Sequence, residues 1–325
     1  MTPRLRNFFT WLGAAACMAM VVAAPAHAAF PDKPVRLVVP FAPGGGTDLI
    51  ARTLGVGMSQ ALGQPVIIEN KPGAGTLIGT DMVAKSPADG YTLVVASFAH
   101  AVNPSLVPKL PYAADKAFTP VILIGRGPNV LAVRSDSPYK TVKDIAAAAA
   151  AKPDRLSYAS QGNGTSAHLA GEMFTNLAKV KMIHIPYKGA GPAITDLLGG
   201  QVDMMFATSS AVGAFIDSGK LRAVGVTTPE RSVALQGVPA IAETVTGYAV
   251  ESWYGLYAPA GTPADVVAKL NAAAKKAAQA DEFRKKIEQE GLVVSAGSPE
   301  ELDAYVRREE ARWRKIVKEN NIKVD

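Results

Sequence analysis

The sequence predicts an α/β protein built from two lobes with a cleft between them. Three observations carry this expectation. Short apolar runs rich in β-branched residues alternate with helical segments, Gly-rich turns separate several of them, and the alternation occurs in two successive blocks. Such alternation is typical of a parallel sheet covered by helices on both faces. The 325-residue chain is long enough for two units of this kind, each with its own core.

The first block occupies roughly the first third of the chain. Its strand segments are rich in Val, Ile, Leu and Thr, and Gly-rich turns follow the first two of them. Strands are expected at Val35–Phe41, Pro65–Glu69, Thr92–Ala96 and Val121–Ile124, and helices at Thr47–Ala61 and Thr76–Lys85.

The second block repeats the same rhythm. Strands are expected at Leu156–Ser160, Met182–Pro186, Val202–Phe206 and Leu221–Val226, and helices at Val142–Ala151, Ser166–Ala178, Pro192–Leu198 and Ala211–Asp217. A further strand, Trp253–Ala258, then precedes two long charged helices at Pro263–Glu290 and Pro299–Asn320.

Two extended segments, Arg126–Val133 and Val245–Trp253, lie at the two ends of the second block. A chain that crosses from one lobe to the other and back needs two such connectors, as in hinged proteins whose cleft closes around a ligand. We therefore expect a discontinuous first lobe of residues 29–127 and 249–325, and a second lobe of residues 128–248. Two consecutive, independent domains are the alternative interpretation.

The amino terminus has the features of a signal peptide. Arg4 and Arg6 precede an apolar stretch from about residue 8 to residue 22, and Ala26-His27-Ala28 supplies the small residues of a cleavage site. The apolar stretch is shorter than the ~20 residues that a membrane span requires. We expect residues 1–28 to be cleaved after Ala28 and the mature protein to lie in the periplasm.

Composition then excludes several classes of function. Cleavage would remove Cys17, the single cysteine, and with it thiolate metal sites, disulfides and a cysteine nucleophile. Removing 28 of 325 residues leaves 297, and losing two of the 34 Lys and Arg residues against 28 Asp and Glu leaves a net charge of +4. The basic residues are scattered or interleaved with acidic ones, so the sequence gives little support for nucleic-acid binding.

Gly44-Gly45-Gly46-Thr47-Asp48 is the most informative segment. A strand ends there, glycines turn the chain, and Thr47 and Asp48 stand where a helix begins. Free N–H groups in the first turn of a helix form a ready site for an anion. The Asp48 carboxylate would repel a phosphate, so it fits better as a cap or as an anchor for a water. An ordinary tight turn is the alternative.

A second segment repeats these features in the second block. The strand ending at Ser160 runs through Gly162-Asn163-Gly164 into Thr165 and Ser166, both candidates for a helix N-cap. Ligands of open α/β sheets bind beyond the carboxyl ends of the strands, so two such turns could face each other across a cleft. His168, one turn into the helix, is expected to have a structural role.

Motifs that would indicate catalysis are missing. Lys71–Gly79 resembles a dinucleotide-binding turn only weakly, because it follows the second strand and lacks the acidic partner. The chain has no Gly-x-Ser-x-Gly elbow, Walker lysine or His-Glu-x-x-His motif, and its histidines have no metal-ligand spacing. Ser97 follows a strand and is better explained as a polar ligand contact than as a nucleophile. We expect no enzyme activity, no metal and no cofactor.

Several motifs, in order along the mature chain, resemble the receptors of tripartite tricarboxylate transporters, known as Bug receptors. The motifs are Pro40–Asp48 with Ala51-Arg52, Val66–Gly75, Ser86–Leu93, Gly162–His168 with Glu172, Ile185–Ala193 and Gly200–Asp203. The resemblance implies a type II periplasmic-binding-protein fold with a central ligand cleft and a hinge. It also implies a small organic carboxylate ligand, delivered to membrane permease subunits, and we expect the receptor to be a monomer. The third glycine, Gly46, departs from the usual pattern and leaves open which amide faces the ligand.

The resemblance further implies a set of ligand-binding residues. Phe41 would line the pocket, and Gly45, Gly46 and Thr47 would meet a carboxylate through backbone groups and ordered water. Ser97 and Phe98 would lie on the next loop of the first lobe. Residues of the opposing lobe would be Gly164, Thr165 and Ser166, with Tyr187, Lys188 and Asp203 nearby. A receptor that feeds a sensor kinase, and a periplasmic hydrolase, are the alternative functions.

Overall fold

The structure is a computed structural model that describes residues 30–233, 235–289, 291–320 and 322. The expected signal peptide and its cleavage site lie outside the described residues. Contacts within Lys33–Asp325 make this segment one compact unit, which contains every helix and strand described below. In the described part of the chain, no helix is long and apolar enough to cross a membrane.

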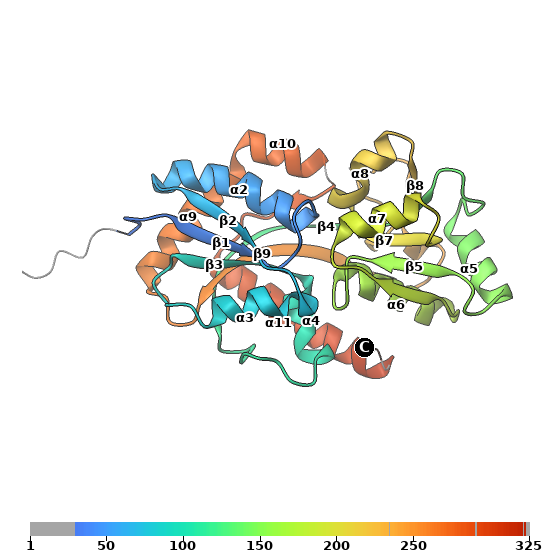
Figure 1. The fold of residues 1–325 in the computed structure, drawn as a ribbon, viewed down its shortest axis with the longest axis horizontal. Helices are drawn as coiled ribbons and strands as arrows, with labels where there is room; N and C mark the ends of the chain where they lie inside the picture. The colour runs from blue at the N-terminus through green and yellow to red at the C-terminus, as the bar shows by residue number, and fades with distance from the viewer. Residues whose placement is uncertain (1–29, 234, 290, 321, 323–325) are drawn as a thin grey trace, which may run out of the picture. The chain divides into compact units, whose positions relative to one another are not determined.

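The first sheet places three parallel strands in the order β2-β1-β3, followed by β9, which is antiparallel to β3 (Figure 1). The strands are β1 (Val35–Val39), β2 (Val66–Asn70), β3 (Thr92–Ser97) and β9 (Glu251–Pro259). The helices that follow the parallel strands are α2 (Gly46–Leu62), α3 (Leu77–Ala84) and α4 (Phe98–Leu106), and the short turn η1 (Ala74–Thr76) precedes α3. β3 is buried along its whole length, as expected for a strand covered on both faces.

The second sheet has the same strand order. β6-β5-β7 are parallel, and β4 is antiparallel to β7. The elements are β5 (Ser157–Ser160), β6 (Ile183–Pro186), β7 (Met204–Thr208) and β8 (Leu221–Val226), with α5 (Val142–Ala151), α6 (Ser166–Ala178), α7 (Ala190–Leu198), α8 (Ser209–Asp217) and the short turn η2 (Ile241–Glu243). In both sheets, the chain leaves the carboxyl end of each parallel strand and then enters a helix.

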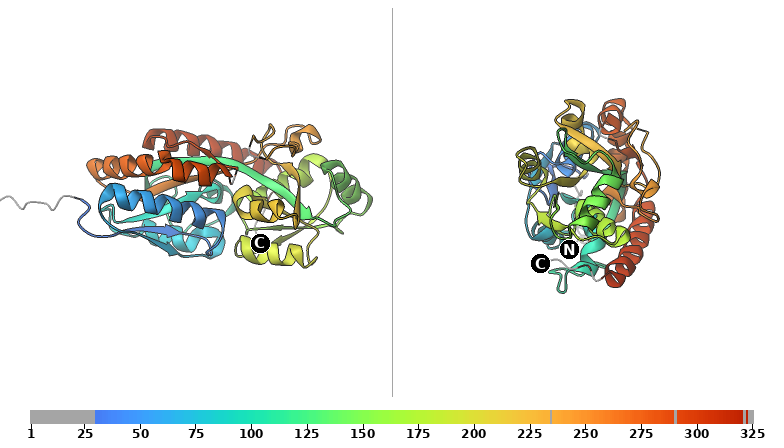
Figure 2. Two further views of the ribbon diagram at one scale, coloured as in Figure 1. Left: turned by 90° about the horizontal axis from the view of Figure 1, so that it is seen from above. Right: turned by 90° about the vertical axis from the view of Figure 1, so that its right-hand side faces the viewer.

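β4 (Phe118–Arg134) joins the two sheets as one continuous strand, visible as the long green strand in the left view of Figure 2. Its residues 118–128 pair with β9, and residues 129–133 pair with β7. The sequence predicted only Val121–Ile124 as a strand here and treated Arg126–Val133 as a connector. Both belong to β4, because its buried, apolar pattern continues through Arg134 with only Arg126 exposed among residues 121–133.

The carboxyl-terminal segment packs on elements of the first sheet. α9 (Ala264–Gln279) lies so close to α2 that a Cβ added at Gly57 would come within 2.7 Å of the Ala277 Cβ. The Trp313 ring of α11 (Pro299–Glu319) meets the Phe98 ring edge-on at 4.9 Å. α10 (Asp281–Gln289) and the short strand β10 (Val293–Val294) lie between them in sequence, and β10 pairs with β4.

Two expectations about helices are wrong. The single helix predicted over Pro263–Glu290 is two helices, because Ala280 adopts an extended conformation (φ −64°, ψ 139°) and ends α9. The segment after β3 is not a loop, because Ser97 leads directly into α4. Pro104 inside α4 hides that helix from sequence analysis, since proline normally ends a helix.

Asn271 of α9 links the carboxyl-terminal segment to β4, and it provides a test of this packing. Its Nδ2 donates to the carbonyl of Val121 at 2.7 Å and to the carbonyl of Gly297 at 3.1 Å. Asn271→Ala leaves both carbonyls without this donor, so we expect the free energy of unfolding in urea to fall by about 1–3 kcal/mol. Lys275→Ala, at an exposed position on the same helix, should change it by less than about 0.5 kcal/mol. Equal losses in the two variants would contradict this role of Asn271.

Candidate functional site

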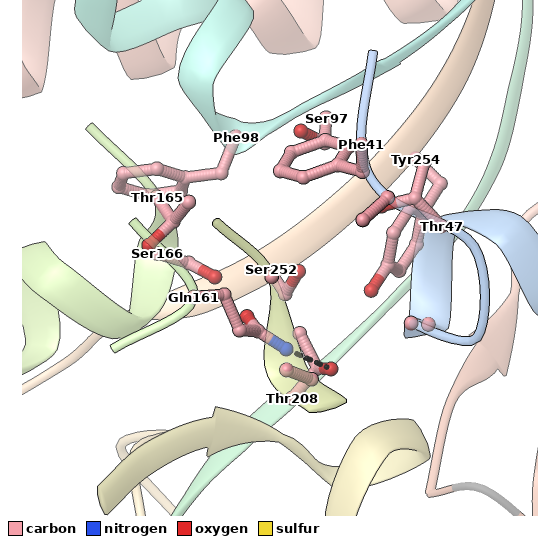
Figure 3. A pocket seen from close by; sticks show the side chains of 15 residues that line it. Phe41, Thr47, Ser97, Phe98, Gln161, Thr165, Ser166, Thr208, Ser252 and Tyr254 are labelled. Atoms are coloured by element: carbon pink, nitrogen blue, oxygen red, sulfur yellow. Dashed lines mark hydrogen bonds between the residues drawn. The ribbon is translucent and has the colours of Figure 1, made fainter. Parts of the chain in front are cut away.

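A small cavity lies where the carboxyl ends of the parallel strands from the two sheets meet (Figure 3). We call it the inner cavity. The carboxyl ends of β1, β3, β5, β6 and β7, and the segments that follow them, contribute most of its walls, and β9 contributes the rest. Fifteen residues line it: Phe41, Ala42, Gly45, Gly46, Thr47, Ser97, Phe98, Gln161, Thr165, Ser166, Gly189, Ala190, Thr208, Ser252 and Tyr254.

Five helices begin at the inner cavity. Their N-cap residues are Gly45 for α2, Ser97 for α4, Thr165 for α6, Gly189 for α7 and Thr208 for α8, and all five line it. Only the Thr165 side chain caps its own helix, by accepting from the N–H of His168. The other first turns therefore direct N–H groups and the positive ends of their helix dipoles toward the cavity.

None of the fifteen lining residues carries a formal charge. The polar groups are backbone amides, the hydroxyls of Ser, Thr and Tyr residues, and the Gln161 carboxamide, whose Nε2 donates to Thr208 Oγ1 at 3.1 Å (Figure 3). The apolar part consists mainly of the Phe41 and Phe98 rings. Such a cavity can hold an anionic group by dipoles and hydrogen bonds, with apolar surface beside it.

Asp48 anchors the loop between β1 and α2 and does not line the inner cavity. Its buried carboxylate accepts from the Gly44 N–H, from Arg52 Nε and from Asn70 Nδ2, each at 3.0 Å. Burial would raise the pKa of Asp48, but these hydrogen bonds outweigh it and lower that pKa. The carboxylate thus fixes the loop while Gly46 and Thr47 begin α2. Within the described residues no hydrogen bond uses the N–H of either.

The loop between β5 and α6 is fixed by its own hydrogen bonds. Thr165 Oγ1 donates to the Gly162 carbonyl at 2.7 Å as well as capping α6. The Ser166 hydroxyl donates to Oδ1 of the fully buried Asn129 in β4, at 3.0 Å. Gly164, in a left-handed conformation (φ +75°), turns away from the inner cavity, and its N–H bonds His168 Nδ1 at 3.2 Å.

The ring of the buried His168 stacks on the ring of the half-buried His184, with ring centroids 4.3 Å apart. Burial lowers the pKa of His168 to about 3, to which the nearby His184 also contributes, and burial lowers the pKa of His184 to about 4. A neutral His168 keeps Nδ1 free to accept the Gly164 N–H, while Nε2 lies 3.8 Å from the Glu172 carboxylate. The structural role expected for His168 is therefore confirmed.

The structure brings together most of the residues proposed from sequence. Phe41, Gly45, Gly46, Thr47, Ser97, Phe98, Thr165 and Ser166 all line the inner cavity. Gly164 does not line the inner cavity, and its N–H bonds His168 instead. Tyr187 instead lines a neighbouring outer cavity, and its hydroxyl donates to Asp196 at 2.6 Å.

Asp203 is not at either cavity. It immediately precedes β7, at the opposite end of that strand from Thr208, and its carboxylate accepts from the N–H and the hydroxyl of Ser157. A ligand contact from Asp203 would require a position at the carboxyl end of the strand, so Asp203 does not lie near the cavity as the sequence predicted.

Seven lining residues were missed from the sequence: Ala42, Gln161, Gly189, Ala190, Thr208, Ser252 and Tyr254. Gly189 and Thr208 each follow a strand and begin a helix, so the strand-to-helix pattern that identified Gly46 would also have found them. No comparable pattern marks Ser252 and Tyr254, because they reach the cavity only through the pairing of β9 with β3 and β4. Among described residues, no cluster of three His, Cys, Asp or Glu side chains could hold a metal ion.

Residues 50–322 match the sequence model of the family described as "Tripartite tricarboxylate transporter family receptor". The chain belongs to this receptor family. Among solved structures, the receptor is similar to the periplasmic binding protein BugD, with 36% identity, a TM-score of 0.87 and coverage of 90% of this chain and 99% of that one. The family and this similarity place the receptor among periplasmic solute-binding proteins.

Two further similar structures come from Rhodopseudomonas palustris. One is a protein with adipate, 35% identical over 90% of this chain and 99% of that chain, with a TM-score of 0.87. The other is MatC with bound malate, 36% identical over 89% of this chain and all of that chain, with a TM-score of 0.84. These likenesses confirm the expected two-lobed type II periplasmic-binding-protein fold of the receptor.

The buried histidines make the stability of the receptor depend on pH. In the unfolded chain His168 binds a proton below about pH 6.5, whereas in the folded state it remains neutral to a much lower pH. Stability is therefore full above pH 6.5 and falls as the pH is lowered, by about 2 kcal/mol between pH 7 and pH 5 for this histidine. Urea unfolding at a series of pH values measures the effect.

His168→Asn provides the comparison, because its Oδ1 can still accept a hydrogen bond but does not titrate. The free energy of unfolding of this variant should fall less steeply than that of the wild type as the pH is lowered. His100 and His184 also have lowered pKa values and supply the remaining part. An unchanged slope in His168→Asn would show that His168 is not the group that titrates.

Proposed function

We propose that the receptor binds a small organic carboxylate in the inner cavity and delivers it to the permease subunits of a tripartite tricarboxylate transporter. The observation that carries this proposal is the convergence of five helix amino termini on a cavity whose lining has no formal charge. The ligand-binding groups we propose are Phe41, Gly45, Gly46, Thr47, Ser97, Phe98, Thr165 and Ser166. The adipate and malate in the two similar structures support the same ligand class.

The expected free energy of carboxylate binding is sufficient for micromolar affinity without an arginine in the cavity. A carboxylate gains about 0.3–1 kcal/mol from each helix dipole, and up to ~2 kcal/mol where partly buried. Hydrogen bonds to a charged group contribute about 1.5–3 kcal/mol each. Micromolar binding corresponds to about −8 kcal/mol, so a few amide and hydroxyl contacts are enough.

Binding is proposed to close two lobes, residues 29–127 with 249–325 and residues 128–248. The sheets are linked through β4 and through the chain between β8 and β9, which suits a hinge. Across the cavity the two sides lie close together. A Cβ added to Gly46 would fall 2.1 Å from Ser210 Oγ and 3.1 Å from Thr208 Oγ1. The positive ends of α2 and α8 repel each other at this distance, and an anion between them would relieve the repulsion.

The remaining parts of the proposal concern location and chemistry. The receptor would be exported, cleaved after Ala28 and monomeric in the periplasm. It would not be an enzyme, because none of the fifteen lining residues is a His, Cys, Asp, Glu or Lys that could transfer a proton near neutral pH. Permease subunits would recognise the closed form, which only a ligand with higher affinity for that form can populate.

A ligand screen tests the charge requirement directly. Purified mature receptor should show a raised Tm with at least one member of a panel of carboxylates, because a ligand that binds only the folded state stabilises it. The corresponding primary amides, which have nearly the same shape without the negative charge, should give no shift. Equal shifts with acids and amides, or none with any acid, would refute the carboxylate proposal.

Two glycines in the first turns of helices, Gly46 of α2 and Gly191 of α7, offer a matched test of closure around that acid. Gly46→Ala places a methyl group against Ser210 of the opposing side, so overpacking should lower affinity at least tenfold, or about 1.4 kcal/mol. Gly191→Ala, at an exposed position that does not line the inner cavity, has nothing within 4 Å of the new Cβ and should change affinity less than threefold. Neither position has a positive φ, so neither substitution strains the backbone.

Calorimetry with the acid found in the screen measures both affinities, and the Tm without ligand checks folding. Removing the opposing hydroxyl in Gly46→Ala/Ser210→Ala should recover part of the loss. Wild-type affinity in folded Gly46→Ala would place the ligand outside the inner cavity.

A further inference from the structure

The turn between β2 and α3 has an unusual backbone conformation. Its four consecutive residues Gly73, Ala74, Gly75 and Thr76 have positive φ angles of 129°, 47°, 60° and 81°. Glycine adopts such angles freely, but Ala74 and above all the β-branched Thr76 adopt them only at a cost in energy. A strained conformation of this kind persists only where the surrounding structure enforces it, and it often marks a functional segment.

Asn103 of α4 enforces this conformation. Asn103 is only 2% exposed, and its Nδ2 donates to the Gly75 carbonyl at 3.0 Å and to Thr76 Oγ1 at 3.3 Å. The Thr76 carbonyl in turn accepts from the Thr80 hydroxyl at 2.9 Å. α4 starts from Ser97, which lines the inner cavity. One buried amide therefore attaches the strained turn to a helix that begins at the inner cavity.

The same side chain and the same turn also meet the second sheet's side of the cleft. A Cβ added at Gly164, in the loop between β5 and α6, would lie 2.8 Å from Asn103 Oδ1. A Cβ added at Gly75 would lie 3.3 Å from the Asn163 carbonyl oxygen. The two sides can approach this closely because both positions are glycine. Asn103 thus lies where the Gly-rich turns of the two sheets touch.

This contact lies outside the inner cavity. Gly75 and Thr76 line the outer cavity on one side, and Gly162 and Asn163 line it on the other. Asn103 lines neither the inner nor the outer cavity, so it is not among the residues that would touch a ligand there. Any effect of Asn103 on ligand binding must therefore act through the turn that it holds.

We propose that Asn103 is a positioning residue that latches the cleft, because it holds the strained turn where that turn meets Asn163 and Gly164. This inference rests on the proposed closure of the two lobes, but it involves none of the proposed ligand-binding groups. Without the Asn103 amide, the turn would relax to ordinary φ angles and withdraw the surface that the opposite turn contacts. The closed form would lose a contact that the open form lacks, so the cleft would open more often and release ligand faster.

Distances between two spin labels, measured by pulsed electron spin resonance, report this equilibrium directly. Lys85→Cys at the end of α3 and Asn176→Cys on α6 place the labels at exposed positions on the two sides. Asn103→Ala in this background should lower the ratio of short to long distances about fivefold, both without ligand and with malate or adipate as probes. Stopped-flow release of whichever probe binds should become faster by a similar factor.

Asn271→Ala is the matched control. Asn271 Nδ2 also donates to two oxygen atoms, but Asn271 lies on α9 and lines neither cavity. Both alanine variants should lose stability in urea, whereas only Asn103→Ala should change the distance ratio and the release rate. Asn103→Leu is a second variant that keeps about the same side-chain volume but cannot donate a hydrogen bond, so it should repeat the effect with less disturbance of packing.

The outcomes separate this inference from the proposed function. Wild-type distance ratios in the folded Asn103 variants, or an equal change in Asn271→Ala, would refute the latch while the carboxylate site stands. If neither Asn103 variant folds, Asn103 supports the first sheet as a whole and a specific role in closure is likewise refuted. If no acid of the panel binds, the proposed function fails, but a lowered ratio without ligand in the Asn103 variants would still support the latch. One unchanging distance in wild-type receptor under every condition would refute both the closure and the latch.

Discussion

The rest of this structure depends on the unsatisfied N–H groups at the amino termini of its helices. A helix begins with donors that its own backbone cannot satisfy. Here five helices begin at one place, and four of their N-cap residues give no side-chain hydrogen bond to the first turn. The receptor therefore maintains a region of positive potential made only of dipoles. A carboxylate is the group that satisfies such donors without requiring a second buried charge.

A site of dipoles also explains why the cavity contains no arginine. A buried guanidinium would lose its hydration whether or not ligand is present, and that loss can exceed the later gain from the ion pair. Backbone amides carry only partial charges and are held by the helices themselves. The charged residues close to the site are used to hold loops, as Asp48 does with Arg52 and Asn70.

The strand β4 connects the two sheets at the site. It pairs with β9 in its first part and with β7 and β8 in its second, so a small change of twist near residues 127–129 would reorient one sheet against the other. Asn129 lies at this junction, where its backbone pairs with Thr227 and its side chain accepts from Ser166 at the start of α6. The α6 end of the site is therefore attached to the strand that links the sheets.

The sequence by itself determined the local features of this receptor. Periodicity and Gly-rich turns predicted most strands and the starts of α2 and α6, because these depend on neighbouring residues: Gly44 permits the turn before α2 through its positive φ (+85°), and Thr165 caps its own helix. Only the tertiary structure decided which distant segments meet. Tyr254 and Ser252 reach the inner cavity because β9 pairs with β3 and β4, and Asp203 is excluded because it precedes β7, whose opposite, carboxyl end reaches the cavity. Such contacts are fixed by pairing and packing across long separations in the chain, which no local pattern of residues encodes.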